Sequence, residues 1–148
     1  MRGGVIIYKG NCYLYVGTEL EYAKSKEQQT LTDYKFMCFN GKFRCSFVCT
    51  DRFSPSGLKV TFFDENGERL PFERHYKAST EEIKMPEQYN EMIELAEKLS
   101  KGIPFVRVDF YVSCDRIYFG ELTFYPGSGM EDFHPEIWDY KLGDWLSI

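Results

Sequence analysis

The sequence lacks any long hydrophobic run. Near the N-terminus, the apolar stretch at residues 5–7 is followed at once by Tyr8 and Lys9. This stretch is too short for the core of a signal peptide and far too short for a membrane span. We therefore expect neither export nor membrane insertion.

The sequence also lacks an excess of basic residues. It contains 18 Lys and Arg against 23 Asp and Glu, a net charge of -5 with a pI near 5.1. A protein that depends on phosphate-backbone contacts is normally basic, so this balance argues against general nucleic-acid binding. It does not exclude a local basic cluster that holds a small phosphorylated ligand.

Metal-binding and nucleophile patterns are missing as well. The five cysteines include no C-x-x-C pair, and Cys45 and Cys49 stand four apart without a second pair. Cys45 and Cys49 therefore predict strand packing rather than a zinc site. The odd number of cysteines favours reduced thiols, and these predict a cytoplasmic location. His75 and His134 have no partners at ligand spacing, and no Ser-His-Asp or Cys-His set emerges.

What the sequence does contain is typical of one globular domain. The chain has 148 residues, of which 43% are apolar and 18% aromatic, with 13 Phe and 11 Tyr. This length suits a single core, and the aromatic content favours a sheet. The composition predicts an α+β fold.

The middle of the chain predicts an antiparallel meander. Residues 34–39 and 42–50 flank Asn40 and Gly41, a strong hairpin signal, and residues 59–63 form a third candidate strand before a turn at 64–68. Upstream, residues 13–16 are a candidate strand, but the rest of residues 1–32 shows no clean periodicity.

Two amphipathic helices are expected. The first begins near Pro86 and ends before Gly102, because proline favours a first turn and glycine a helix end. Its apolar stripe comprises Tyr89, Met92, Ile93, Ala96 and Leu99. The second spans residues 135–146, with Trp138, Leu142 and Trp145 as packing residues, after a loop at 126–129.

Charged residues alternate along a predicted hairpin of residues 105–112 and 116–124. Arg107 and Asp109 share one face, and Glu121 on the next strand can lie on the same face. Mg²⁺ would relieve the repulsion between the two carboxylates, and Arg107 would reach a phosphoryl group. The alternative is a solvent-facing, salt-bridged strand face, and spacing alone does not decide between them.

Several blocks of this sequence resemble one enzyme family. Residues 105–111 and 117–129 resemble the distal half of ATP-grasp enzymes, and the match is best with the TupA-like branch of teichuronopeptide biosynthesis. Residues 33–42 and 138–143 resemble the same branch. The resemblance implies an ATP-grasp C-terminal subdomain over residues 33–148, a poorly matched segment at 1–32, and a truncated chain that lacks the first subdomain.

The resemblance also implies roles for individual residues. Asp109 and Glu121 correspond to metal ligands, Arg107 to a phosphate contact, and Lys35 to a basic residue aimed at the phosphates. Thr123 stands where the family usually has an asparagine ligand, so a second metal would be held more weakly or through water.

Three further residues are candidates for nucleotide contacts. The resemblance implies an acidic adenine-side hinge just upstream of residue 33, and Glu21 lies at about that distance, with a solvated surface glutamate as the alternative. Arg52 could contact phosphate or pair with a neighbouring carboxylate such as Asp51. Ser128 and its neighbouring backbone amides could hold an anion, although a glycine-rich turn does not require a ligand.

The function implied by the resemblance is ATP-dependent, magnesium-dependent carboxylate–amine ligation in the biosynthesis of a cell-surface polysaccharide or teichuronopeptide. Some members are labelled glycosyltransferases from their gene surroundings, so a sugar-linked acceptor is one expectation. The alternatives are a non-catalytic remnant and a protein-interaction module that uses exposed aromatics. We expect a partner-covered sheet face, through a missing half or self-association, and weak nucleotide binding without turnover in the isolated chain.

Overall fold

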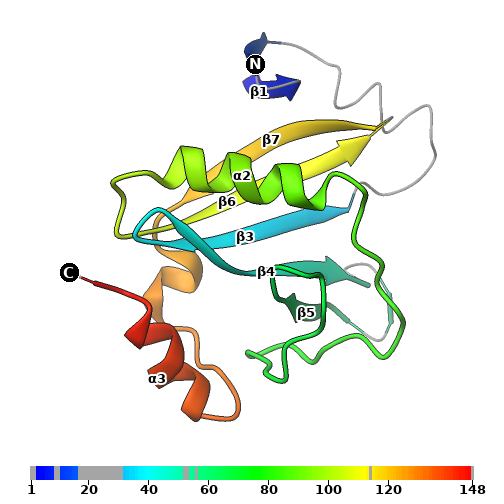
Figure 1. Ribbon diagram of the computed structural model, residues 1–148. Helices are drawn as coiled ribbons and strands as arrows, with labels where there is room; N and C mark the ends of the chain where they lie inside the picture. Colours follow the sequence, from blue (N-terminus) through cyan, green and yellow to red (C-terminus); the bar gives the residue numbers. More distant parts are fainter. Residues whose placement is uncertain are drawn as a thin grey trace.

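The computed structural model describes residues 3–8, 11–16, 32–51, 54–55, 57–113 and 115–147. These residues form a seven-stranded sheet in the order β2-β1-β7-β6-β3-β4-β5, with every neighbouring pair antiparallel (Figure 1). The strands are β1 (Gly3–Tyr8), β2 (Asn11–Val16), β3 (Asp33–Phe39), β4 (Lys42–Thr50), β5 (Lys59–Phe63), β6 (Phe105–Ser113) and β7 (Arg116–Thr123). The predicted α+β class with an antiparallel sheet is confirmed.

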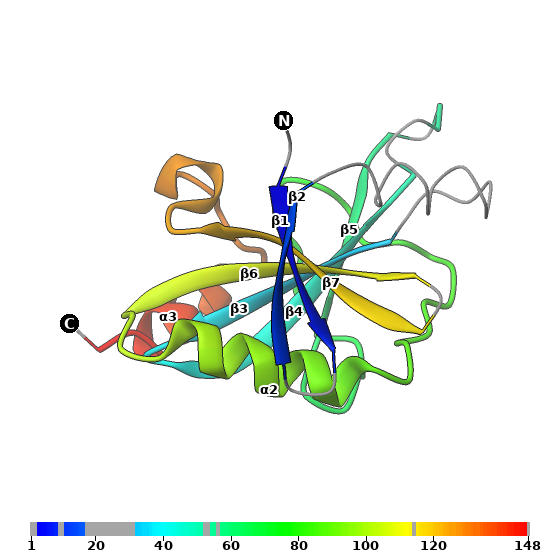
Figure 2. The same ribbon diagram turned by 90° about the horizontal axis from the view of Figure 1, so that it is seen from above.

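The helices lie on opposite sides of this sheet. The α-helices of the described residues are α2 (Tyr89–Ser100) and α3 (Ile137–Asp144), and a short 3-10 turn, η1 (Pro126–Gly129), follows β7. Figure 2 shows α2 on one side of the sheet and η1 on the other. None of these helices is long and apolar enough to cross a membrane.

The meander forms as the turn chemistry predicts. Asn40 and Gly41 join β3 to β4 with φ values of 52° and 75°, and a two-residue hairpin turn of this kind requires positive φ at both positions. Strand β5 then pairs with β4 from Ser46↔Phe63 to Thr50↔Lys59. On the other side of β3, the pairing with β6 runs from Asp33↔Tyr111 to Phe39↔Phe105.

The N-terminal residues add a hairpin to the sheet. The candidate strand at residues 13–16 lies within β2, which pairs with β1, and β1 joins the edge of β7 through Ile6↔Tyr118 and Ile7↔Ile117. The sequence pattern did not predict β1. Its period-two signal is weak because two glycines begin it.

Helix α2 covers the first face of the sheet. Phe36 is fully buried at the centre of this core, 5.5 Å in ring centroid distance from each of Phe43, Tyr89 and Phe110. The helix begins at Tyr89, later than predicted, because a preceding turn joins the Tyr89 N–H to the Pro86 carbonyl. Its buried stripe includes Leu95, whereas Ile93 and Leu99 of the predicted stripe are only partly buried.

The second face of the sheet is apolar on one half. The buried side chains on this half are Met37, Phe39, Cys45, Phe47, Val60, Phe62, Phe72 and Leu142. Trp138 and Trp145 pack against them, as predicted for the C-terminal helix, although α3 is shorter than the predicted range. The other half of this face, over β3, β6 and β7, carries charged side chains.

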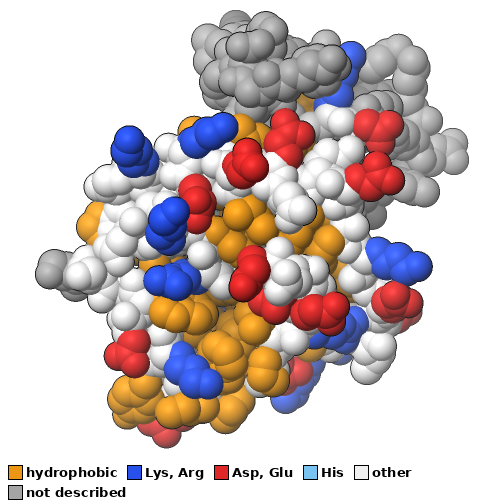
Figure 3. Space-filling model, viewed as in Figure 1, with side chains coloured by type: hydrophobic (Ala, Val, Ile, Leu, Met, Phe, Trp, Pro, Cys, Tyr) orange, Lys and Arg blue, Asp and Glu red, His pale blue; other side chains and the backbone are white. Residues whose placement is uncertain are grey.

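Large hydrophobic side chains also reach the surface. Five of them follow β7, in the segment that leads into α3 and in the helix itself: Phe124, Tyr125, Met130, Ile137 and Tyr140. Hydrophobic side chains are visible over the α3 end of the molecule in Figure 3. Coverage of such a surface by a partner or a second copy stays a prediction, and light scattering would test it.

Candidate functional site

The candidate site is a row of side chains across the second face of the sheet. Lys35 on β3 pairs in register with Phe47 on β4 and with Asp109 on β6. One row further along, Met37 pairs with Arg107, which in turn pairs with Thr123 on β7. Cross-strand neighbours on one face lie within side-chain contact. The register therefore brings residues distant in sequence together.

A β-bulge completes this row on β7. The register of β6 and β7 shifts between Val108 and Phe110, so Asp109 faces both Gly120 and Glu121. A Cβ atom on Gly120 would lie 2.9 Å from a ring carbon of Tyr111 and 3.0 Å from the Asp109 carbonyl oxygen. The bulge therefore requires glycine here, and it directs Glu121 onto the face of Asp109.

Arg107 joins the two predicted metal ligands. Its Nε atom donates to Oδ1 of Asp109 and its Nη2 atom to Oδ2, each at a distance of 2.7 Å. Nη2 also lies 2.7 Å from Oε1 of Glu121. The Thr123 hydroxyl donates to the same Glu121 oxygen at a distance of 3.0 Å. The predicted convergence of Arg107, Asp109 and Glu121 on one face is confirmed.

Lys35 links the cluster to a carboxylate for which the sequence suggested no role. Its Nζ atom donates to Oδ2 of Asp109 and forms a 2.7 Å ion pair with Oδ2 of Asp33. Oδ1 of Asp33 is buried without a hydrogen-bond partner. The signal for Asp33 was its period-two spacing from Lys35, which places both on one face of β3.

Burial is graded across the cluster. The Asp109 side chain is 1% exposed and those of Lys35 and Arg107 about a tenth, whereas Glu121 is 60% exposed. Burial alone lowers the pKa of Lys35 and of Arg107, but the adjacent carboxylates outweigh it and raise both above their usual values. Burial raises the pKa of Asp33 despite its Lys35 partner. Lys35 and Arg107 are therefore both positively charged near neutral pH.

The donor set suits a hard cation. Asp109, Glu121 and Thr123 offer only oxygen atoms, the ligands that Mg²⁺ prefers. Among the residues that the structure describes, no group of three or more His, Cys, Asp or Glu side chains is arranged to hold a metal ion. Arg107 contacts both carboxylates here, as the salt-bridged alternative predicts, and the metal-ligand roles of Asp109 and Glu121 stay predictions. Asp109, however, is buried rather than solvent-facing.

The three residues predicted to contact the nucleotide lie outside this cluster or outside the described residues. Ser128 is exposed within η1 and has a φ value of 60°. Its N–H donates to the Tyr125 carbonyl at a distance of 3.1 Å. Its role as an anion contact stays a prediction. Glu21 and Arg52 lie outside the described residues.

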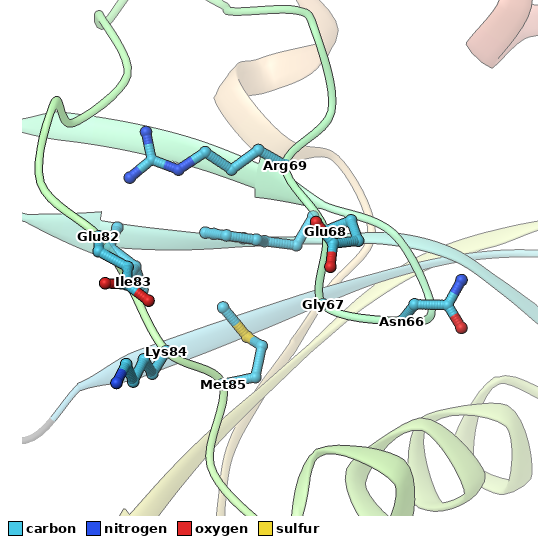
Figure 4. Close-up of a pocket in the computed structure, with 9 residues that line it drawn as sticks. Asn66, Gly67, Glu68, Arg69, Glu82, Ile83, Lys84 and Met85 are labelled. Atoms are coloured by element: carbon cyan, nitrogen blue, oxygen red, sulfur yellow. The ribbon is translucent and has the colours of Figure 1, made fainter.

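A depression in the described surface lies apart from this cluster. It lies between two loop segments, residues 66–69 and 82–85, and has a volume of about 560 Å³. Figure 4 shows the side chains that line it. It borders Phe63, which belongs to the core under α2, whereas the charged cluster lies on the opposite face. The Arg69 guanidinium here donates to the Ser79 and Glu81 carbonyls. This basic group therefore has a structural role.

The sequence of this chain matches a known family over most of its length. The family model of TupA-like ATPgrasp proteins matches residues 18–147, nearly the whole chain. The match begins upstream of Asp33. The chain therefore belongs to the TupA-like ATP-grasp family.

A solved structure of the ATP-grasp ligase PsnB, complexed with minimal precursor, Mg and ADP, is similar at 12% identity and a TM-score of 0.36. The similarity covers 82% of this chain and 38% of the PsnB chain, so this chain spans well under half the length of that ligase. A search of the curated proteins found no match.

Proposed function

We propose that the charged face of β3, β6 and β7 binds the phosphates of a magnesium nucleotide as part of an ATP-grasp ligase. The observation that carries this proposal is the convergence of Arg107, Lys35 and Glu121 around the buried carboxylate of Asp109. Family membership supports it. A buried carboxylate between two cations is an expensive arrangement, and such groups concentrate at functional sites.

Each side chain has a part in this proposal. Asp109 and Glu121 would hold Mg²⁺, with Thr123 as a weaker oxygen donor, and the ion would neutralise charge on the phosphates. Arg107 and Lys35 would exchange their carboxylate partners for phosphate oxygens and stabilise the transferring group. The Arg107 guanidinium now lies between the two carboxylates, so it must turn aside when a cation enters.

The reaction we propose is ATP-dependent ligation. A substrate carboxylate takes the terminal phosphoryl group, and an amine then displaces phosphate to form an amide. Positioning and charge stabilisation would supply most of the rate enhancement. The acceptor that the family resemblance favours is a component of a bacterial cell-surface polymer.

A non-catalytic role is the second candidate. The observation that favours it is that Asp109, in this structure, is fully paired with Arg107 and Lys35. Under this alternative the cluster holds three strands together and binds no cation, and the chain serves as an interaction subunit.

Calorimetric titration with Mg-ATP separates these candidates. We expect Glu121→Gln to weaken binding about 10- to 100-fold, because losing one charged ligand removes about 1.5–3 kcal/mol. Glu121 is the best residue to change because its side chain is 60% exposed. Glu94→Gln on the exposed side of α2 is the matched control and should bind as the wild type does. Equal affinities in all three proteins would support the non-catalytic role.

A further inference from the structure

Arg74 lies against the same aromatic ring as Arg107. Its Cζ atom is 4.5 Å from the centroid of the Phe47 ring, and the Arg107 Cζ atom is 6.0 Å from that centroid. Phe47 is also the register partner of Lys35. Three cationic side chains from separate segments therefore surround one buried phenylalanine beside Asp109.

The guanidinium of Arg74 is only partly satisfied. Its side chain is 10% exposed, and Nη1 lies 2.5 Å from Oε2 of Glu131. Its Nε atom is buried and has no hydrogen-bond partner. A buried donor without a partner is costly, and a ligand oxygen would relieve that cost.

The partner of Arg74 distinguishes it from the other two cations. Lys35 and Arg107 each contact two carboxylates of the central cluster, which includes Asp109. Glu131 lies outside that cluster, in the segment after η1, and its side chain is 26% exposed. Water can therefore solvate Glu131 when Arg74 leaves it, so Arg74 is the cation most easily released to a ligand.

We propose that Arg74 is a third phosphate-binding residue of this site, paired with Glu131 until a phosphorylated ligand displaces that carboxylate. This proposal rests on the proposed function. A guanidinium matches phosphate geometry through paired N–H groups, and the free Nε–H is one such donor. The sequence had no signal for this role, because Arg74 lies in a loop between turns.

Opposite effects of two substitutions test the proposal. With Mg-ATP and Mg-tripolyphosphate as probes, Arg74→Gln should weaken binding of both roughly tenfold, as expected for one charge-assisted hydrogen bond. Glu131→Gln should tighten both severalfold, because Arg74 no longer has a competing carboxylate. Arg44→Gln is the control, since that guanidinium lies over Trp145, 5.9 Å from the ring centroid, and should leave binding unchanged.

A purely structural Arg74–Glu131 pair predicts a different pattern. Both substitutions would then lower the melting temperature, and neither would tighten binding. If Glu121→Gln weakens Mg-ATP binding while the Arg74 and Glu131 variants bind like the wild type, the role of Arg74 is wrong and the proposed function stands. Undetectable binding of both probes to the wild-type protein would contradict both proposals.

Discussion

Asp109→Ala is expected to lower the free energy of unfolding by about 3–5 kcal/mol. The side chain is 1% exposed and accepts hydrogen bonds from Lys35 and Arg107. Its removal takes away the shared partner of two buried cations and leaves Lys35 with Asp33 alone and Arg107 with Glu121 alone. Breaking a buried ion pair by removing one partner costs about this much. Urea denaturation followed by circular dichroism measures the loss.

The comparison for this prediction is Glu121→Gln. Glu121 contacts Arg107 as well, but its side chain is 60% exposed, so we expect a loss below about 1 kcal/mol. A loss of less than about 1 kcal/mol for Asp109→Ala itself would show that the cluster relaxes freely or admits water, contrary to the burial described above.

Phe47→Ala is expected to cost a similar amount, about 3–5 kcal/mol, because it leaves a cavity in the core of the second face. Phe47 is 1% exposed, and its ring centroid lies 5.1 Å from that of Phe62. The ring also supports the guanidinium groups of Arg74 and Arg107. Thermal and urea unfolding would measure the change.

A pair of milder substitutions separates packing from site geometry. Phe47→Leu and Phe62→Leu affect residues that are equally buried, and each should cost less than about 1.5 kcal/mol if the core repacks around the smaller side chain. Only Phe47→Leu should weaken Mg-ATP binding, because only Phe47 lies under both guanidiniums. Equal affinities in the two variants would show that the ring does not position Arg74 and Arg107.

Local signals were sufficient to predict much of the fold. Asn40 and Gly41 specify the β3–β4 turn through their positive φ values, and the meander up to Phe63 follows from it. Period-two spacing placed Arg107 and Asp109 on one face. These features depend on neighbouring residues, and the sequence contains that information directly.

Features that depend on long-range packing could not be predicted. The bulge opposite Asp109 reverses the alternation of β7, so that Phe119 packs with the α2 core while Glu121 faces the opposite side. Gly120 within a strand was the available signal for it. The contributions of Phe47 and Arg74 depend on segments that meet only in the folded chain.

The proposed site for the metal and the phosphates is the charged face of β3, β6 and β7. Mn²⁺ replaces Mg²⁺ at carboxylate sites, and its unpaired electrons broaden nearby amide signals in nuclear magnetic resonance spectra. With Mn-ADP, we predict selective broadening around Asp109, Gly120 and Glu121, which is lost in Glu121→Gln. Broadening centred on the depression at residues 66–69 and 82–85, or no broadening at all, would contradict binding on this face.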